Sequence, residues 1–282
     1  MSESIRQRYF AHLVKHCCSV PASHRFVMLS GGIDSFTLLA ALMQTHKPSD
    51  VTAMNVGGVS TYDYAKAVEA ARYFGIKQVV RRVCMNDILE NVRVCSGTTD
   101  NSVFQLVFRV SCNLLFKDHP ITGCAVYQGD GADSLYGNSS SFVYMRTAEV
   151  AKQKRITVVA AREILRREYR AKMIFGKKIG TALLVSQTIK QFGGTPVLPW
   201  MSGEFEYVLD VPLKAFRGDK KQWVRDGLIS EWGISRSVVD SRRRCSMQDG
   251  LGYYRLICKE LCQTYRTSTP NAAVRMIARG LA

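Results

Sequence analysis

The chain has 282 residues, 46% of them hydrophobic, which is enough for one large globular domain or for a domain with an appended subdomain. It contains no run of 18 apolar residues and no continuous apolar segment near its N-terminus, so we expect neither a membrane-spanning helix nor a secretory signal peptide. Its 39 basic and 23 acidic side chains give a net charge of +16, which attracts polyanions and leaves nucleic acid open as a partner.

Nine cysteines are scattered along the chain without a C-x-x-C pair or nearby histidines, which excludes a typical zinc site. We expect them to be free thiols in a reducing compartment, and we therefore place the protein in the cytoplasm, away from membranes. The sequence leaves the oligomeric state open.

The first predicted element is an amphipathic helix over residues 4–18, which ends before Pro21. An apolar strand follows at residues 25–29, then the turn Ser30-Gly31-Gly32-Ile33-Asp34-Ser35, then an apolar periodic helix at residues 36–43. The order is strand, glycine turn and helix.

The turn at residues 30–35 has the composition of a phosphate-binding loop. Two glycines let the backbone approach a bulky anion, and the following helix offers free N–H groups and the positive end of its dipole. The hydroxyls of Ser30 and Ser35 add neutral donors. A carboxylate repels phosphate unless a cation lies between them, so Asp34 predicts Mg²⁺ and with it a polyphosphate. The turn is neither a Walker A loop nor G-x-G-x-x-G, and a plain turn with a capping Asp is the alternative.

Strands and helices continue to alternate after this turn. Residues 51–56 are predicted to form an apolar strand, residues 62–74 a helix capped by Gly75, and residues 78–83 a third strand. This βαβ pattern predicts a mostly parallel sheet with helices on both faces, which binds its ligand beyond the carboxyl ends of the strands.

A second acidic turn follows the next predicted strand. A helix over residues 103–116 leads to an apolar strand at residues 121–127, which delivers the turn Gln128-Gly129-Asp130-Gly131-Ala132-Asp133. Two carboxylates at i and i+3 in such a turn form either a solvated or calcium-like loop or a magnesium site. The position after a strand, in a chain that already has the first turn, favours the magnesium site.

The chain from residue 145 to residue 192 is predicted to be helical and rich in basic side chains. One stripe of these side chains recurs at helical spacing and consists of Arg162, Arg166, Arg167 and Arg170. We expect this stripe to be a solvated helix face, because Tyr169 is the only aromatic residue among the arginines that could stack on a base. A nucleic-acid surface is the alternative.

The turn at residues 30–35 matches SGGxDS, the fingerprint of the PP-loop (N-type) ATP pyrophosphatases. More closely, the chain resembles the synthetase domain of asparagine synthetase and its relatives β-lactam synthetase and carbapenam synthetase. Further stretches carry the resemblance in the order of that family, at residues 54–80, 128–137, 220–226 and 242–253. The resemblance spans about residues 5–262.

The resemblance implies an α/β fold like that of the adenine nucleotide alpha hydrolases, with a mostly parallel, doubly wound sheet and a helical C-terminal subdomain. It divides the chain into a nucleotide-binding core at residues 1–144 and a mainly helical part at residues 145–282 that completes the active site. It also implies residues that bind ATP or pyrophosphate: Met28, Ser30, Gly31, Gly32, Asp34, Ser35, Val56, Gln128 and Gly129.

The resemblance assigns the remaining site residues one by one. Asp133 joins Asp34 as the second Mg²⁺ ligand. Asp130 falls near the reacting acyl centre, where asparagine synthetase has Glu and β-lactam synthetase has Tyr. Lys221 matches a lysine that grips the phosphates, and Arg244 falls on the catalytic lysine. Because arginine does not act as an acid near neutral pH, we expect Arg244 to stabilise an oxyanion or pyrophosphate.

Further departures concern the substrate and the nitrogen donor. Thr195, Val197 and Ser202 stand where the family has the Glu, Arg and Asp that help hold the substrates, so we expect aspartate to be a poor substrate. A glutaminase domain is not expected, because position 2 is Ser rather than Cys and about 25 residues precede the first strand. The nitrogen would then come from free ammonia, from a separate amidotransferase partner, or from an amine in the substrate.

The predicted function is an ATP-dependent carbon–nitrogen ligase that adenylates a small carboxylic acid and transfers it to ammonia or an amine, with release of AMP and pyrophosphate. One alternative is a PP-loop enzyme that modifies a base in tRNA or DNA, which the net charge favours and the lack of paired cysteines opposes. The other is a degenerate synthetase domain that binds nucleotide without catalysis, which the departures favour and the intact Asp34 and Asp133 oppose.

Overall fold

The computed structural model describes residues 4–57, 61–84, 86–87, 90–91, 103–136, 141–175, 180–216, 221–242 and 254–278. In this part of the chain, five strands form one parallel sheet in the order β3-β2-β1-β4-β5. The strands are β1 (Arg25–Met28), β2 (Val51–Val56), β3 (Lys77–Arg81), β4 (Ala125–Tyr127) and β5 (Thr195–Val197). The predicted mostly parallel sheet is confirmed, and β1 lies at its centre.

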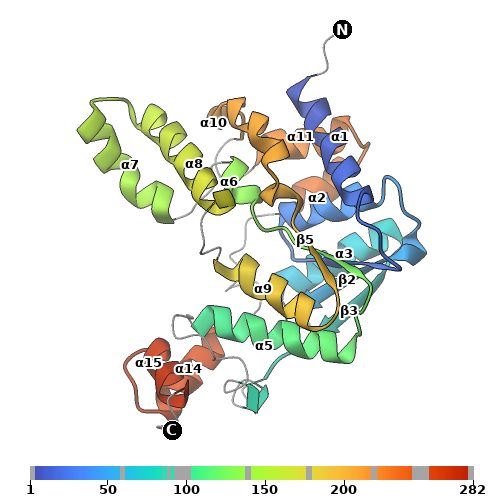
Figure 1. Cartoon of the computed structure of the whole chain (residues 1–282), viewed down its shortest axis with the longest axis vertical. Coiled ribbons are helices and arrows are strands. Elements are labelled where there is room, and N and C mark those ends of the chain that lie inside the picture. The colour runs from blue at the N-terminus through green and yellow to red at the C-terminus, as the bar shows by residue number, and fades with distance from the viewer. Residues whose placement is uncertain are drawn as a thin grey trace.

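Helices contribute to two cores, one on each face of the sheet (Figure 1). The first core draws on α1 (Ile5–Cys18), α2 (Ile33–Leu42), α3 (Tyr62–Phe74), α11 (Gln222–Ser230) and α12 (Arg236–Asp240). The second draws on α5 (Val103–Asp118), α9 (Gly180–Gln191), α14 (Tyr254–Thr264) and α15 (Pro270–Ala278). No helix in the described ranges is long and apolar enough to cross a membrane.

The alternation of side chains along the strands explains these two cores. Successive residues of a strand point to opposite faces of a sheet. Val27 and Ala53 accordingly lie in the first core, while their neighbours Phe26 and Met54 lie in the second. The predicted doubly wound α/β fold, with helices on both faces, is confirmed.

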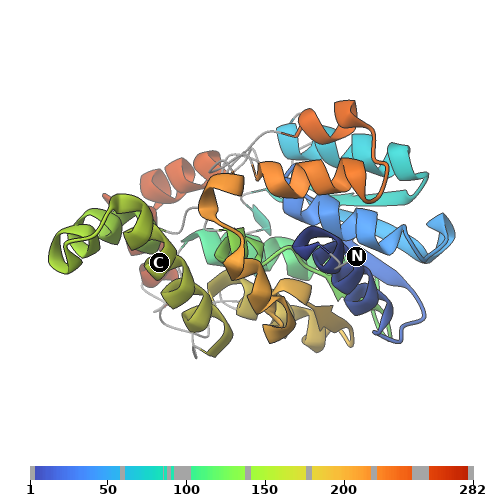
Figure 2. The same cartoon turned by 90° about the horizontal axis from the view of Figure 1, so that it is seen from above.

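The long connection between β4 and β5 contains α6 (Ala132–Tyr136), α7 (Ser141–Lys154), α8 (Val158–Phe175) and α9. Helices α7 and α8 form a hairpin that extends away from the sheet in both views (Figures 1 and 2). Short segments complete the fold, namely the 3₁₀ turns η1 (Pro48–Asp50), η2 (Pro199–Met201) and η3 (Gly203–Asp210) and the helix α10 (Leu213–Phe216). Because α9 and β5 belong to the sheet layers, the later part of the chain also builds the core; the division at residue 144 stays a prediction.

Local signals in the sequence account for several element ends. Helix α1 begins with a capping box in which Ser4 accepts from the N–H of Gln7. Helix α3 ends at Gly75, whose φ of 66° is the left-handed conformation expected of a glycine cap. The strand expected at residues 121–127 is shorter, because the N–H of Cys124 bonds back to the carbonyl of Ile121 and β4 begins only at Ala125.

The arginine stripe predicted on α8 is buried at two of its positions, so both interpretations of the stripe were wrong there. Arg166 and Arg170 are 0% exposed. Arg166 donates to the backbone carbonyls of Leu135, Val208 and Val211 at 2.6, 3.0 and 2.9 Å.

Arg170 acts in the same way on the next turn of α8. It donates to the carbonyl of Ser202 at 2.8 Å and pairs with Glu206 at 2.7 Å. The carbonyls around η2 and η3 lack the partners that a regular helix would give them, and a guanidinium supplies several donors in one plane. The two arginines therefore fasten α8 to the segment after β5, while Arg162 and Arg167 are exposed.

Candidate active site

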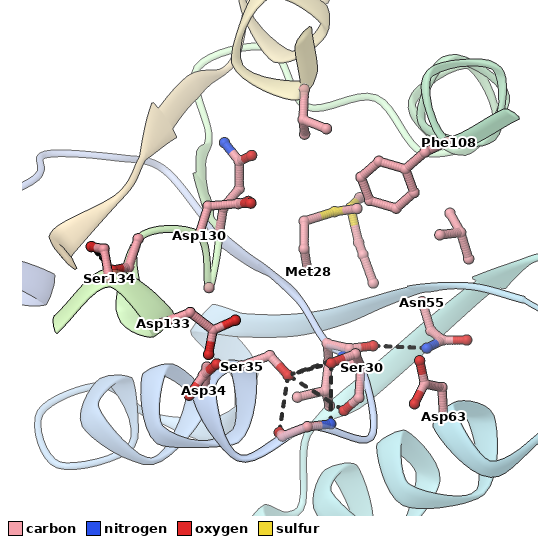
Figure 3. Close-up of a pocket in the computed structure, with 18 of the residues that line it drawn as sticks. Met28, Ser30, Asp34, Ser35, Asn55, Asp63, Phe108, Asp130, Asp133 and Ser134 are labelled. Atoms are coloured by element: carbon pink, nitrogen blue, oxygen red, sulfur yellow. Dashed lines mark hydrogen bonds between the residues drawn. The ribbon is translucent and has the colours of Figure 1, made fainter. Parts of the chain in front are cut away.

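A cavity of about 290 Å³ opens beyond the carboxyl ends of β1, β2 and β4, where an open α/β sheet binds its ligands (Figure 3). Three of its lining residues, Asp34, Asp130 and Asp133, gather at one end (Figure 3). Phe108, Asn55 and Asp63 lie at the other end, with Met28 between the two groups (Figure 3).

Hydrogen bonds fix the loop between β1 and α2. The backbone N–H of Ser30 donates to the hydroxyl of Ser35 at 3.1 Å, and the two hydroxyls lie 3.0 Å apart. The N–H of Gly32 donates to the Ser30 hydroxyl at 3.2 Å, and Gly32 itself caps α2. Asn55 at the end of β2 donates its side-chain N–H to the carbonyl of Leu29 at 2.7 Å. The loop is therefore preformed, with the N-terminus of α2 open toward the cavity.

Position 31 requires a glycine, because α3 closely approaches the loop there. The N–H of Gly31 donates to Oδ1 of Asp63 at 3.1 Å, and a Cβ at this position would lie 2.7 Å from that oxygen and 2.8 Å from the ring of Tyr62. Burial raises the pKa of Asp63 to about 6, and the bond from Gly31 offsets part of that effect. Asp63 was not predicted, because an Asp in the first turn of a helix is an ordinary helix-end residue in a sequence.

Lys221 joins the two predicted metal ligands. Its ammonium group donates to Oδ2 of Asp34, in the first turn of α2, and lies 2.6 Å from Oδ1 of Asp133, in the first turn of α6. The residue precedes α11 in a left-handed conformation, with φ of 48°. Burial alone would lower the pKa of Lys221, but the charges of Asp133 and Asp34 outweigh burial and raise it.

The carboxylates at this end of the cavity are electrostatically unfavourable as anions. Burial raises the pKa of Asp34 to about 6, against the lowering effect of Lys221 and with a further rise from the charge of Asp133. Burial, followed by the charges of Asp133 and Asp34, also raises the pKa of Asp130 to about 6. A positive charge supplied by a ligand would relieve both groups.

The arrangement fits a magnesium ion. Asp34 and Asp133 hold one cationic group between them, and Oδ1 of Asp34 is buried without a hydrogen-bond partner in the described structure. No group of three His, Cys, Asp or Glu residues in the described ranges could hold a metal. Two carboxylates, completed by water and substrate phosphates, are the way in which proteins commonly hold Mg²⁺.

The structure brings most of the predicted site residues together in the cavity wall: Met28, Ser30, Gly32, Asp34, Ser35, Val56, Gln128, Gly129, Asp130 and Asp133. Gly31 lies in the loop, and Lys221 lies behind the two carboxylates. Arg244 lies outside the described residues. Thr195, Val197 and Ser202 are not among the described residues that line the cavity.

Several lining residues were not predicted from the sequence. They share no motif, and they come from elements on either side of the sheet: Asn55, Asp63, Phe108, Ser134, Tyr169, Met173 and Val185. The amide of Gln128, whose role in nucleotide binding was predicted, is 2% exposed and donates to Ser186 at 3.3 Å, which leaves its carbonyl oxygen without a partner. Among the described residues, the wall thus offers unpartnered acceptor oxygens at Gln128, which was predicted, and at Asn55, which was not.

The fold and this loop define a nucleotide-binding α/β protein of the PP-loop type. The sequence matches the asparagine synthase family over residues 13–203, which is more than half of the chain. The chain therefore belongs to the asparagine synthase family, whose members are ATP-using ligases that form amides.

Comparison with other proteins adds two observations. Among solved structures, the chain is similar to NMN synthetase from Francisella tularensis, with 14% sequence identity and a TM-score of 0.42 over 99% of this chain and 94% of that one. No curated protein sequence matches the chain significantly.

Proposed function

We propose that the chain is an ATP-dependent, AMP-forming ligase that adenylates a carboxylic acid and transfers the acyl group to ammonia or an amine. The observation that carries this proposal is the ammonium of Lys221 held between Asp34 and Asp133 beside the loop of Ser30 and Ser35. Two carboxylates, a lysine and a set of loop donors at one point match the needs of a metal-bound triphosphate.

The reaction has two steps and needs only ATP, the carboxylic acid and the nitrogen nucleophile. A substrate carboxylate oxygen attacks the α-phosphorus of ATP, the bond to the β-phosphate oxygen breaks, and pyrophosphate leaves. The nitrogen then attacks the acyl carbon, AMP leaves, and a proton is lost from the nitrogen. Mg²⁺, when bound at Asp34 and Asp133, would neutralise phosphate charge.

The residues of the chain have separate tasks in this scheme. The N–H groups at the start of α2 and the hydroxyls of Ser30 and Ser35 would bind the phosphates. Lys221 would move from the carboxylates to the departing pyrophosphate once Mg²⁺ replaces it. Asp130, whose pKa burial raises to about 6, would take up the proton from the nitrogen.

The test is exchange of labelled pyrophosphate into ATP with a panel of carboxylic acids. Adenylation predicts that one class of acid supports exchange and that AMP and the amide appear once the right amine is added. ADP as the only nucleotide product would overturn the mechanism. ATP binding without exchange for any acid, with or without tRNA or DNA, would support a non-catalytic nucleotide-binding domain instead.

A further inference from the structure

The hairpin of α7 and α8 is set apart from the rest of the molecule. Both views show it extending beyond the sheet and the helices that cover it (Figures 1 and 2). It has a small core of its own, formed by Val150, Ala161 and Leu165. The second half of α8 fastens it to the body through Arg166 and Arg170. The turn between the two helices is therefore the free end.

This free end carries a concentrated positive charge. Residues 141–175 contain nine basic and three acidic side chains, and no acidic residue occurs between Val150 and Arg162. We define the basic tip as Lys152, Lys154 and Arg155, which are all exposed. None of the three forms an ion pair with a residue in the described ranges. Their charges are available to a partner.

Helix α8 connects the basic tip with the cavity. Its second half contributes Tyr169 and Met173 to the cavity wall, while its first residue, Val158, lies three positions after Arg155 of the tip. At 1.5 Å per residue, the helix covers about 20 Å between Val158 and the cavity wall. A ligand bound at the tip and reaching the cavity must therefore span about 20 Å and carry negative charge where it meets the tip.

We propose that the basic tip binds the sugar-phosphate backbone of a nucleic acid and so presents one of its nucleotides to the cavity. The partner is chosen by charge complementarity, because the chain has a net charge of +16. Each strand of a DNA duplex places a phosphate about every 3.4 Å along the helix axis, so that roughly six base pairs span the distance. The tip contains no aromatic residue, so the contacts are with phosphates and not with stacked bases.

An anionic membrane is the rival partner, because Val158 and Val159 beside the tip are 52% and 66% exposed. Two valine side chains provide little apolar surface for insertion into a bilayer, whereas the charges suit phosphates in either setting. The nucleic-acid proposal rests on the proposed function, since it makes the acyl or amine substrate a group carried by a nucleotide.

The test compares two variants that change the net charge equally. The first reverses the basic tip by Lys152→Glu, Lys154→Glu and Arg155→Glu. The control reverses three exposed residues elsewhere by Lys47→Glu, Arg72→Glu and Lys77→Glu. Binding to fluorescein-labelled 20-nucleotide RNA, duplex DNA of the same length and total tRNA is measured by fluorescence anisotropy at several salt concentrations. A neutral variant with Gln at the three tip positions guards against helix damage by Glu.

We expect the reversed tip to weaken binding at least tenfold and the neutral tip severalfold, with the control within twofold of the wild type. The slope of log affinity against log salt concentration should fall by about 2 to 3, in keeping with three lost phosphate contacts. Equal losses in the tip and control variants, or no binding by the wild-type chain, would overturn the proposal.

Binding to vesicles with 30% phosphatidylserine tests the rival partner. If the tip variants lose binding to vesicles but not to nucleic acid, the tip is a membrane-binding surface and the proposal is wrong. Pyrophosphate exchange tests the proposed ligase activity independently of nucleic-acid binding at the tip. Exchange with a free acid should be unchanged in all tip variants. Absence of exchange in the wild type with every free acid and with every nucleic acid offered as the carboxylate source would count against the ligase while leaving the binding result intact.

Discussion

The Nζ atom of Lys221 lies 2.6 Å from Oδ1 of Asp133 and joins the start of α11 to the first turn of α6. The same ammonium also pairs with Asp34, so a single positive charge of the chain stands between two carboxylates from distant segments. A divalent cation and this ammonium would use the same oxygens. Metal binding and the Lys221 pairs are therefore alternatives, and the phosphates of a nucleotide give the released lysine a new partner.

Replacing Lys221 by Met should lower the free energy of unfolding by about 2 kcal/mol, because two carboxylates would face each other without a counter-charge. In the absence of nucleotide, MgCl₂ should then raise the melting temperature of this variant by about 4 °C more than that of the wild type, since the ion now meets no competitor. Differential scanning fluorimetry measures both effects. Lys214→Met, at an exposed residue of α10, is the control, and an equal magnesium response in all proteins would contradict the competition.

Asp34→Asn and Asp133→Asn should each reduce pyrophosphate release by at least about 100-fold at saturating magnesium, because each removes a charged ligand of the proposed ion. The fold should persist, which circular dichroism can check. Asp240→Asn, at an exposed residue of α12, should keep full activity. A loss of only a few-fold would remove Asp34 or Asp133 from the metal site.

Gly31→Ala should destabilise the protein by about 1–3 kcal/mol, because the new methyl group would lie within 3 Å of Asp63 and Tyr62. Gly32→Ala provides the matched comparison. Its methyl group would meet only the Ser30 hydroxyl, at 3.3 Å, so the cost should stay below about 1 kcal/mol. Urea denaturation of the two variants checks the ranking, and equal costs would show that α3 does not press on the loop.

Asp63→Asn should change how stability depends on pH. Because burial raises the pKa of Asp63 to about 6, the folded protein holds a proton between about pH 4 and pH 6 that the unfolded chain has lost. The contribution of Asp63 is thus largest below pH 4 and is lost as the pH rises through 6. The Asn variant keeps an acceptor for Gly31 and has no such loss.

The stability of Asp63→Asn relative to wild type should accordingly increase by up to about 3 kcal/mol from pH 4 to pH 7. Urea denaturation at the two pH values measures this difference. A difference between wild type and Asp63→Asn that stays constant from pH 4 to pH 7 would contradict the raised pKa.

Arg166→Met should destabilise the protein by about 3–5 kcal/mol, because it leaves several buried carbonyl groups without a donor. Lys154→Met, at an exposed position of the same hairpin, should change the stability by less than about 0.5 kcal/mol. Thermal or urea unfolding distinguishes the two. A small effect of Arg166→Met would mean that α8 is held by other contacts.

The sequence predicted the parts of this molecule that depend on short-range patterns. Alternating apolar strands and periodic helices predicted the parallel sheet, because each segment carries its own periodicity. The family resemblance paired Asp34 with Asp133, and the structure gives the physical reason: each follows a strand, and the carboxyl ends of parallel strands share one edge of the sheet. The family resemblance predicted that Lys221 binds the phosphates, but its pairing with both carboxylates was not predicted.

Contacts between distant segments could not be predicted in this way. The bond from Gly31 to Asp63 depends on how closely α3 packs on the loop, and no periodicity specifies that distance. The spacing of Arg166 and Arg170 predicted a common helix face correctly, but a polar stripe ordinarily faces water. Here it faces carbonyl groups that the irregular segment after β5 leaves unpaired, which a sequence shows only once the partners are known.

The connection from β4 to β5 spans residues 128–194, and its two ends are pinned to adjacent strands through the pairing of Ala125 with Thr195. The entropy of closing a loop grows only slowly with its length, so the turn between α7 and α8, in the middle of this connection, can lengthen or shorten at little cost to the sheet. The loop of Ser30 and Ser35 lies in a different part of the chain. Residues 128–131 and 133, at the start of this connection, line the cavity, whereas residues 152–155 at the far end of the hairpin are not among the described residues that line it. The far end of the hairpin is therefore the part of the connection where related chains can exchange sequence without altering the cavity wall.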